Sequence, residues 1–281
     1  MDTSNSDVAA IMAVYDQVDP DHLDQALGGL CDQTLRPKEV IVAEDGALTR
    51  QLYDVLEKYA SPMLPLRRIA LPAKSGSGPA RQAALMSTDC ALVAIADADD
   101  ISLSRRFARQ REALEAGSFD VVGAAMLEFS DCWPGESIRL LPETHDQILR
   151  RAAFNNPVNH PTMFIRRQAA VAVGGYRDLP FLEDYDLVAR MLAAGARAHN
   201  LAEPLVRFRV GDLTLDRRSS RAARRAELAL QRNLHSYGLV TRRRMVANLA
   251  VRNGYRKLPR PMQRWAHQRL LSSPLPEGAT K

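Results

Sequence analysis

Short apolar runs alternate with amphipathic segments along the first half of the chain. The apolar runs are nearly continuous, which is typical of β-strands buried on both faces, and they cover residues 8–15, 39–45, 66–71, 90–96 and 120–127. The segments between them carry apolar residues three and four positions apart, which predicts helices over 19–33, 47–59, 78–87 and 103–117. This alternation predicts an α/β fold with a mostly parallel sheet that helices cover on both faces.

The pattern is less regular after residue 128. No regular element is predicted between residues 129 and 160, whereas residues 161–167 predict a strand and residues 182–195 a helix. Residues 196–210 predict two short extended pieces. From residue 217 the chain is predicted to be helical, with an apolar stripe formed by Ala223, Ala226, Leu230, Leu234 and Tyr237.

We therefore expect a main domain over residues 1–216, with one half over about 1–128 and the other over about 129–216, and a helical extension over residues 217–281. The main domain contains 22 Lys and Arg against 31 Asp and Glu, whereas the extension contains 16 against 2. The net charges are therefore −9 for the main domain and +14 for the extension, so an acidic domain is followed by a strongly basic extension. Such an extension indicates either a solvated helical face or attraction to an anionic membrane or nucleic acid.

The composition is that of an ordinary globular protein, with 46% hydrophobic and 25% charged residues. The three cysteines, Cys31, Cys90 and Cys132, are widely spaced and form no CxxC pattern, which indicates reduced thiols rather than a disulfide framework or a zinc site. No apolar run approaches the roughly 20 residues that span a bilayer, and the first ten residues lack the pattern of a signal peptide. These features predict a cytoplasmic protein.

Polar residues follow three of the predicted strands. The residues at these strand ends are Tyr15 and Asp16, Glu44 and Asp45, and Asp97, Asp99 and Asp100. Because the carboxyl ends of parallel strands lie at one edge of a sheet, where ligands bind in open α/β folds, we expect a binding site at this edge.

The DADD segment places three carboxylates within four residues, and these carboxylates repel one another and are costly to desolvate. One acid would suffice to cap the helix predicted to follow. A divalent cation would relieve the repulsion, since carboxylate oxygens are hard ligands that suit Mg²⁺ or Mn²⁺. We therefore favour a metal site over a helix cap.

Two further segments and one histidine carry candidate chemistry. Glu183 and Asp184 begin the helix predicted over 182–195, where the helix dipole favours acids. Residues 74–85 are rich in glycine but lack the Gly-Lys-Ser/Thr of a Walker loop, and they include Arg81. His160 precedes a proline and suits either a hydrogen-bonded loop residue or a ligand.

The order of these segments resembles that of the family 2 glycosyltransferases, which have the GT-A fold. The pieces that carry the resemblance are the EDG turn, ARQ, DADD, NHPTMFIRR, VGGY and EDYDL, over about residues 8 to 210. The resemblance implies a Rossmann-like, mostly parallel sheet flanked by helices, followed here by the basic helical extension. It also implies a metal-dependent, inverting transfer of a sugar from a nucleoside-diphosphate sugar to an acceptor hydroxyl, in the synthesis of a polysaccharide or glycolipid.

The resemblance further implies a role for each site residue. Asp99 would bind Mn²⁺ or Mg²⁺, and Asp97 would reach the ribose or the metal. Asp184 would be the general base that takes the proton of the acceptor, with Glu183 as the alternative. The donor would contact Ala13, Tyr15, Glu44, Asp45, Arg81, Asp97 and Ala98, and the acceptor or the phosphates would contact His160 and Arg209.

The expected partners are the sugar donor, a saccharide or lipid-linked acceptor, and an anionic membrane that residues 217–271 would contact from the cytoplasmic side. Nucleic acid is a less favoured partner, because few aromatic residues lie among the arginines of the extension. Two alternative functions remain open at this point. One is a nucleotidyltransferase on a similar sheet, which would release pyrophosphate, and the other is a regulatory or nucleic-acid-binding module with a basic arm.

Overall fold

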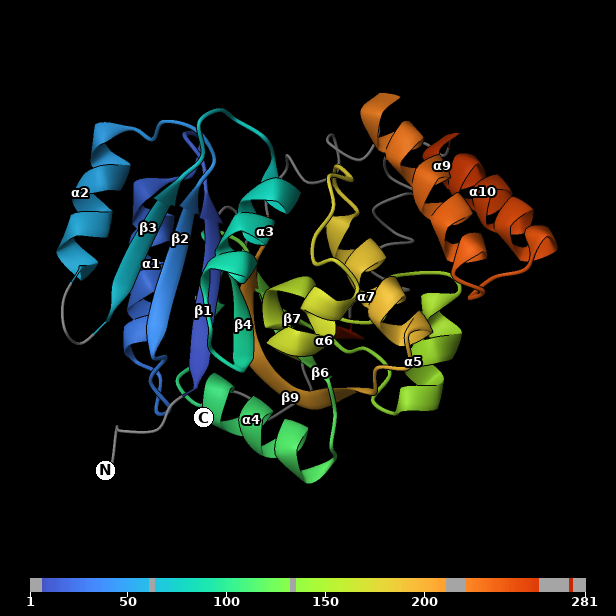
Figure 1. Cartoon of the computed structure of the whole chain (residues 1–281), viewed down its shortest axis with the longest axis horizontal. Coiled ribbons are helices and arrows are strands. Elements are labelled where there is room, and N and C mark those ends of the chain that lie inside the picture. The colour runs from blue at the N-terminus through green and yellow to red at the C-terminus, as the bar shows by residue number, and fades with distance from the viewer. Residues whose placement is uncertain (1–6, 61–63, 132–134, 211–220, 258–272, 275–281) are drawn as a thin grey trace.

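The computed structural model describes residues 7–60, 64–131, 135–210, 221–257 and 273–274. Its centre is one curled, mixed sheet with the strand order β10-β7-β6-β8-β4-β1-β2-β3, to which β9 is added through pairing with β6 and β5 (Figure 1). The strands are β1 (Val8–Val14), β2 (Glu39–Glu44), β3 (Leu66–Ala70), β4 (Leu92–Asp97), β5 (Ile101–Ser102), β6 (Val121–Phe129), β7 (Ser137–Arg139), β8 (Phe164–Arg166), β9 (Ala198–Arg209) and β10 (Ser273–Pro274).

The predicted alternation of strands and helices in the first half is confirmed. Strands β1, β2, β3 and β4 pair in parallel, whereas β8 and β7 introduce antiparallel pairs. The helices described are α1 (Pro20–Cys31), α2 (Arg50–Tyr59), α3 (Ser77–Ser87), α4 (Arg106–Ala116), α5 (His145–Ala152), α6 (Arg167–Ala172), α7 (Glu183–Ala193), α9 (Arg221–Ser236) and α10 (Arg242–Lys257).

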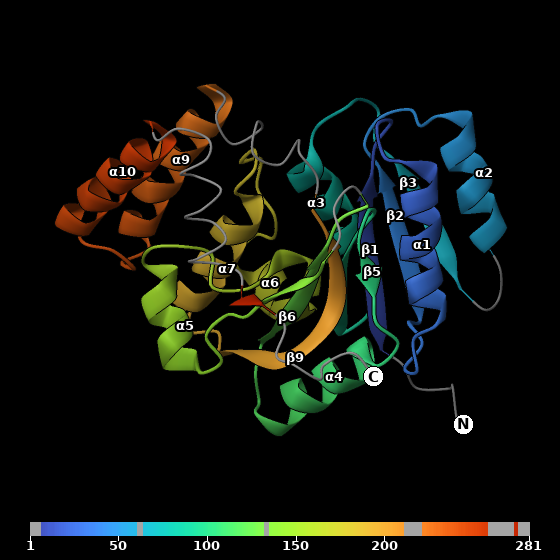
Figure 2. The same ribbon diagram turned by 180° about the vertical axis from the view of Figure 1, so that it is seen from behind.

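Helices cover both faces of the sheet, and the alternation of side chains along β1 explains why (Figures 1 and 2). Val8, Ala10, Met12 and Val14 pack in one core cluster with α1, α2 and α4. Ile11 points to the opposite face and packs in a second cluster with α3, α5, α6 and α7. Since both faces of this strand are covered by apolar helix faces, its sequence reads as one continuous apolar run.

Strand β9 corrects one prediction, because residues 196–210 were expected to form two short extended pieces. They form a single strand of 12 residues that runs parallel to β6. The register shifts beside Ala124 and Ala125 of β6, where Pro204 of β9 lies in the ladder. An irregularity of this kind absorbs the extra residues Ala202, Glu203 and Leu205 and tolerates the proline, so the strand continues where the pattern of side chains is broken.

The irregular stretch between residues 129 and 160 also contains structure that was not predicted. Helix α5 lies within it, and Thr144 and Gln147 form a capping box at its start. Only Ile148 and Ala152 of this helix are buried. A helix of eight residues with two buried positions gives little periodicity, although the spacing of Thr144 and Gln147 was a usable signal.

Helix α9 packs against α7 and has the buried stripe that its sequence predicts. Ala223, Ala226, Leu230 and Leu234 are buried, and Tyr237 is half-buried. Leu230 and Leu234 form a third core cluster with residues of α7. The predicted boundary at residue 216 lies outside the described residues. Among the described residues, no helix is both long enough and apolar enough to cross a membrane.

Asp186 fixes α9 to α7 through a buried polar cluster. Its carboxylate, which is fully buried, pairs with Arg190 Nε at 2.7 Å and accepts hydrogen bonds from Asn233 Nδ2 at 3.0 Å and Tyr237 OH at 2.9 Å. We expect Asp186→Ala to lower the free energy of unfolding by about 3–5 kcal/mol, because it leaves the charge of Arg190 buried and unpaired. Tyr237→Phe should cost only about 0.5–1.5 kcal/mol, since it removes one hydrogen bond to Asp186 and a second one from Arg177, whose exposed side chain water can solvate instead. Urea unfolding measures both, and equal losses would contradict this account.

Candidate active site

The three strand ends that were predicted to carry a site lie side by side. In the ladders of β1, Ala13 pairs with Ala43 on one side and with Asp97 on the other, and Val14 pairs with Glu44. In Figure 1 the strand β1 enters near the N-terminus at the bottom, so the carboxyl ends of β1, β2 and β4 lie at the top, beside the start of α3. The side chains described below gather at this edge.

Arg81 joins the end of β4 to the start of α7. Its guanidinium nitrogens contact Asp97 Oδ1 at 2.6 Å and Glu183 Oε1 at 3.0 Å, and all three side chains are at least four-fifths buried. Ser77 Oγ also donates a hydrogen bond to Glu183 Oε1. Burial opposes ionisation of Asp97, but the charge of Arg81, with a contribution from His160, outweighs it and holds the pKa of Asp97 well below its usual range. Asp97 is therefore a permanent anion beside a permanent cation.

Asp184 has a different environment from its neighbour Glu183. Its Oδ2 accepts a hydrogen bond from Asn156 Nδ2 at 2.8 Å, and its Oδ1 accepts one from the backbone N–H of Tyr185 at 2.7 Å. Burial raises the pKa of Asp184, and the neighbouring charge of Glu183 adds to the effect, whereas His160 opposes it. A carboxylate with a raised pKa accepts a proton more readily than an ordinary aspartate does.

His160 contacts Asp97 at the end of β4 and a tyrosine from a distant segment. Its Nδ1 is 3.7 Å from Asp97 Oδ2, and its Nε2 shares a hydrogen bond with Tyr176 OH at 3.1 Å. The rings of His160 and Tyr176 meet edge to face. The histidine is therefore part of the polar cluster at the strand ends, and its contact with acceptor or phosphates stays a prediction.

The three acids of DADD have distinct surroundings. Asp99 is exposed at the rim of the sheet, whereas Asp100 is buried. Asp100 Oδ1 accepts a hydrogen bond from the backbone N–H of Arg209 at 2.8 Å, but Oδ2 is buried without a hydrogen-bond partner among the described residues. Burial, reinforced by the charges of Asp99 and Asp97, raises the pKa of Asp100 well above its usual range. The carboxylates therefore repel one another, as their sequence predicts.

Arg209 braces this segment from β9. Its Nε donates a hydrogen bond to the backbone oxygen of Asp99 at 3.0 Å, and its Nη2 donates one to Gln25 Oε1 at 2.7 Å. Its Nη1 contacts Asp131, and its guanidinium stacks on Phe129. These contacts hold Arg209 within the protein, and its predicted contact with the acceptor or the phosphates stays untested.

The acids at the end of β2 contact a loop and a neighbouring strand. Glu44 pairs with Arg68 Nε at 2.5 Å, and Tyr53 OH donates a hydrogen bond to it at 3.3 Å. Asp45 accepts hydrogen bonds from the backbone N–H groups of Ser75 at 2.5 Å and Gly76 at 2.9 Å. Asp45 thus holds the glycine-rich segment against the strand ends, and the expected contacts of Glu44 and Asp45 with a nucleobase stay predictions.

The same segment covers the end of β1. Lys74 Nζ pairs with Asp16 at 2.5 Å and lies 5.2 Å from the centre of the Tyr15 ring. Tyr15, at the end of β1, therefore lies next to this loop, whereas Ala98, at the end of β4, is buried in the core. Sequence reasoning missed three contributors to the site, which are Ser77, Asn156 and Tyr176, because no local pattern shows which distant acids they contact.

Gly78 allows α3 to approach α7 closely. A Cβ atom at this position would lie 2.6 Å from the backbone oxygen of Arg177 and 3.3 Å from Glu183 Cβ. We expect Gly78→Ala to cost about 1–3 kcal/mol of stability, because the added Cβ would force α3 away from the backbone of Arg177 and from Glu183. Gly254→Ala is the matched control, since an added Cβ there meets nothing within 4 Å. Urea unfolding checks this, and an unchanged stability of Gly78→Ala would contradict it.

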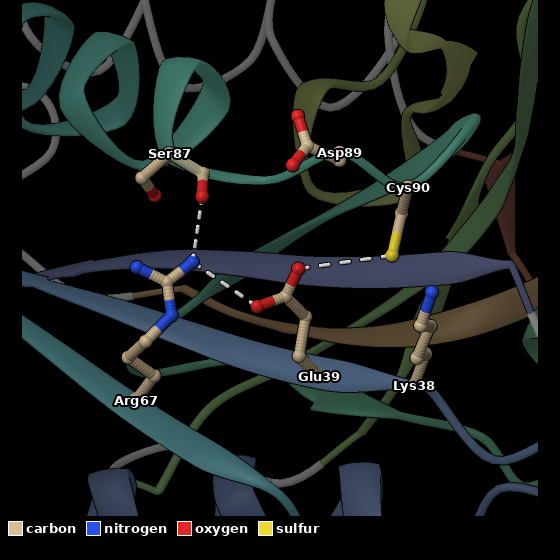
Figure 3. Close-up of a pocket in the computed structure, with 6 residues that line it drawn as sticks. All are labelled: Lys38, Glu39, Arg67, Ser87, Asp89 and Cys90. Carbon is tan, nitrogen blue, oxygen red and sulfur yellow. Dashed lines mark hydrogen bonds and ion pairs between the residues drawn. The ribbon is translucent and has the colours of Figure 1, made fainter.

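A pocket of about 330 Å³ lies away from these residues (Figure 3). It is lined by residues at the amino ends of β2 and near β3 and β4, namely Lys38, Glu39, Arg67, Ser87, Asp89 and Cys90. Arg67 pairs with Glu39 at 3.1 Å and donates a hydrogen bond to the backbone oxygen of Ser87 at 2.7 Å. The pocket is thus at the edge of the sheet opposite to the candidate active site.

Comparison with known sequences identifies the family. A family model described as glycosyl transferase family 2 matches residues 9–174. The amylovoran biosynthesis glycosyltransferase AmsE of Erwinia amylovora is 30% identical over 225 residues, which cover 80% of this chain and 84% of AmsE. The chain belongs to glycosyl transferase family 2 and is a glycosyltransferase, which favours this function over the nucleotidyltransferase and the regulatory module.

A second relative matches over nearly the whole length. The UDP-Gal:alpha-D-GlcNAc-diphosphoundecaprenol beta-1,3-galactosyltransferase of Escherichia coli is 26% identical over 266 residues, which cover 94% of this chain and 96% of that enzyme. The match extends beyond the residues of the family model. The relative therefore shares sequence with the C-terminal part of this chain as well as with the main domain.

Solved structures confirm the predicted GT-A fold. Residues 1–349 of S. aureus TarS, in complex with UDP-GlcNAc, match with a TM-score of 0.68 and 18% identity over 91% of this chain and 77% of that one. This chain spans 44% of the longer TarS chain. The mannosyltransferase PcManGT from Pyrobaculum calidifontis, in complex with GDP-Man and Mn²⁺, matches with a TM-score of 0.62 and covers 96% of this chain.

Proposed function

We propose that the chain transfers a sugar from a nucleoside-diphosphate sugar to an acceptor hydroxyl, with inversion at the anomeric carbon. The observation that carries the proposal is the meeting of two acidic segments at one end of the sheet. Arg81 bridges Asp97 of the first segment and Glu183 of the second, at 2.6 and 3.0 Å. This arrangement supports a proposal in which the acids on one side bind the donor and an acid on the other side acts as the base.

Asp184 is the general base in this proposal. Glu183 is less suited, because its Oε1 accepts hydrogen bonds from both Arg81 and Ser77. Burial raises the pKa of Asp184, and Asn156 holds its carboxylate in one orientation. The acceptor oxygen would bond to the anomeric carbon, its proton would move to Asp184, and the bond from the anomeric carbon to the phosphate oxygen would break to release a nucleoside diphosphate.

The donor site in this proposal is the edge formed by the ends of β1, β2 and β4. Ala13, Tyr15 and Ala98 would face the nucleotide, Glu44 and Asp45 would lie by the base, and Arg81 would hold Asp97 in place. The TarS and PcManGT structures contain UDP-GlcNAc and GDP-Man, which supports a sugar nucleotide as the donor class.

The acids of DADD fit a divalent cation whose remaining ligands would come from the diphosphate of the donor. The described residues contain no group of three or more His, Cys, Asp and Glu side chains arranged to hold a metal ion by themselves. Asp99 is exposed at the rim, and the buried Oδ2 of Asp100 has no hydrogen-bond partner in the described part of the chain, so this cluster of carboxylates favours a nearby cation. We propose that Asp99, with Asp97 as the second candidate, holds Mn²⁺ or Mg²⁺. Such an ion would neutralise charge on the departing diphosphate.

We propose a saccharide acceptor on a lipid carrier, used at the cytoplasmic face of a membrane in polysaccharide assembly. The printed names of two relatives support this acceptor class, one for amylovoran biosynthesis and one for a diphosphoundecaprenol-linked sugar. In this proposal residues 1–216 form the glycosyltransferase domain, and residues 217–281 are appended to it.

Release of nucleoside diphosphate from a panel of UDP-, GDP- and dTDP-sugars, with and without Mn²⁺, tests the proposal. We expect metal-dependent release from at least one donor and a faster rate when lipid-linked saccharides are added. Release from none of the donors would contradict the proposed donor class, and release of pyrophosphate would indicate the nucleotidyltransferase instead.

A further inference from the structure

The C-terminal helices α9 and α10 form a hairpin at one end of the molecule, beyond α7 (Figures 1 and 2). Helix α10 contacts the protein through few positions. Asn248 is buried and donates hydrogen bonds to Ala153 O at 2.8 Å and Gln231 Oε1 at 3.0 Å, and Arg252 pairs with Glu227 at 2.8 Å. The face of α10 that these two residues define is the one directed to the protein.

The opposite face of α10 is apolar and exposed. Val246 is 61% exposed and Val251 is 56% exposed, and Ala247 and Ala250 between them are also exposed. A helix on the surface of a globular protein normally presents charged or polar side chains to water. Here the side directed away from the protein instead carries two large aliphatic side chains.

Arginines surround this apolar face. Arg242, Arg243 and Arg244 are consecutive and exposed in the first turn of α10. Three cations in the first turn repel one another and oppose the helix dipole, which favours anions at that end. Helix α9 adds further exposed arginines, which are Arg224, Arg225 and Arg232.

Acidic side chains do not balance these cations. The only acid between residues 222 and 254 is Glu227, which is 2% exposed and pairs with Arg252. A second copy of this surface would bring like charges together. A surface of phosphates would match the arginines, and backbone N–H groups at the start of a helix add to the attraction for phosphate.

We propose that the α9–α10 hairpin docks on an anionic lipid bilayer, with Val246 and Val251 at the level of the acyl boundary and Arg242 and Arg243 among the lipid phosphates. This combination of an apolar stripe with flanking arginines is the pattern of interfacial helices. The hairpin is fixed to α7 through Asp186, so docking would hold the helix that begins with Asp184 at a constant position relative to the membrane. The surface is argued from α9 and α10 alone and does not depend on the proposed donor or base.

Flotation of the full chain with vesicles tests the proposal, without donor or acceptor present. We expect binding to vesicles that contain phosphatidylglycerol and little binding to pure phosphatidylcholine. R242E/R243E should weaken binding at least about 30-fold, since each arginine near an anionic surface contributes roughly a factor of five and each new glutamate adds repulsion. Glutamates in the first turn of a helix are favoured by its dipole, so this variant should keep the helix.

The matched control is K38E/R105E, which makes the same change in net charge at two exposed residues away from the hairpin. A second variant, V246S/V251S, should weaken binding about tenfold at high salt, where the apolar contribution remains. Failure of the wild-type chain to bind anionic vesicles, or equal losses in R242E/R243E and in the control, would overturn the proposal. A second result would also overturn it. If the wild type is a dimer, and V246S/V251S is a monomer that binds vesicles as well as the wild type does, the apolar face is a dimer interface instead.

Discussion

Asp184→Asn is expected to bind the sugar nucleotide within about twofold of wild type and to transfer the sugar about 10²–10⁴-fold more slowly. The reason is that an amide keeps the shape of the side chain and its single oxygen can still accept the hydrogen bond from Asn156, at the loss of the one from the Tyr185 N–H, but it cannot take the acceptor proton. Isothermal titration with the donor and single-turnover transfer measure the two quantities separately. Asp178→Asn, at an exposed position nearby, is the matched control. Normal transfer by Asp184→Asn would show that Asp184 is not the base.

The pH dependence of transfer gives the same prediction a second measurement. Burial raises the pKa of Asp184, and only the deprotonated carboxylate can accept a proton. The rate should therefore rise with pH through an apparent pKa above about 4, the ordinary value of an aspartate. The residual transfer rate of Asp184→Asn should not show this rise with pH. If the transfer rates of both proteins fall at low pH with the same apparent pKa, the group that titrates is not Asp184.

Arg81→Met is expected to damage both the stability of the protein and its donor site. Arg81 is 11% exposed, and its removal leaves Asp97 and Glu183 buried and without their shared cation. Loss of one member of a buried ionic cluster typically costs about 3–5 kcal/mol. We also expect loss of measurable donor binding, because Asp97 would no longer be held at the end of β4. Chemical unfolding and donor titration measure the two effects.

Arg105→Met, at the exposed position directly before α4, controls for the loss of one arginine. Arg81→Lys should give an intermediate loss, since lysine keeps the charge but cannot form the same two-pronged contact. A stable Arg81→Met variant that binds donor like the wild type would remove Arg81 from the site.

The sequence predicts the fold well where each element has one consistent pattern. Strand β1 and its neighbours are covered on both faces, so their continuous apolar runs identify them. Strand β9 was divided in two, because Glu203 and Pro204 interrupt its pattern at the irregularity opposite Ala124 and Ala125. The partner strand stabilises such a bulge, and a prediction made from one segment of sequence contains no information about its partner strand.

The candidate site could be predicted only in part. Asp97 and Asp99 follow a buried strand, so sheet geometry is enough to place them at the ligand-binding edge. The bridge that Arg81 forms between Asp97 and Glu183 depends on how α3 packs against α7, which no local pattern encodes. The role of Asn156 is hidden in the same way, since its contact with Asp184 joins a loop to a helix start.

The central claim is that the acids at the strand ends bind a sugar nucleotide together with a divalent cation. Calorimetric titration of the matching donor, with and without Mn²⁺, into wild type, Asp99→Ala and Asp184→Asn tests it most directly. We predict saturable, Mn²⁺-dependent binding to wild type and to Asp184→Asn, and loss of the Mn²⁺-dependent binding in Asp99→Ala. Binding of the donor to Asp99→Ala with the same Mn²⁺ dependence as wild type would contradict the claim.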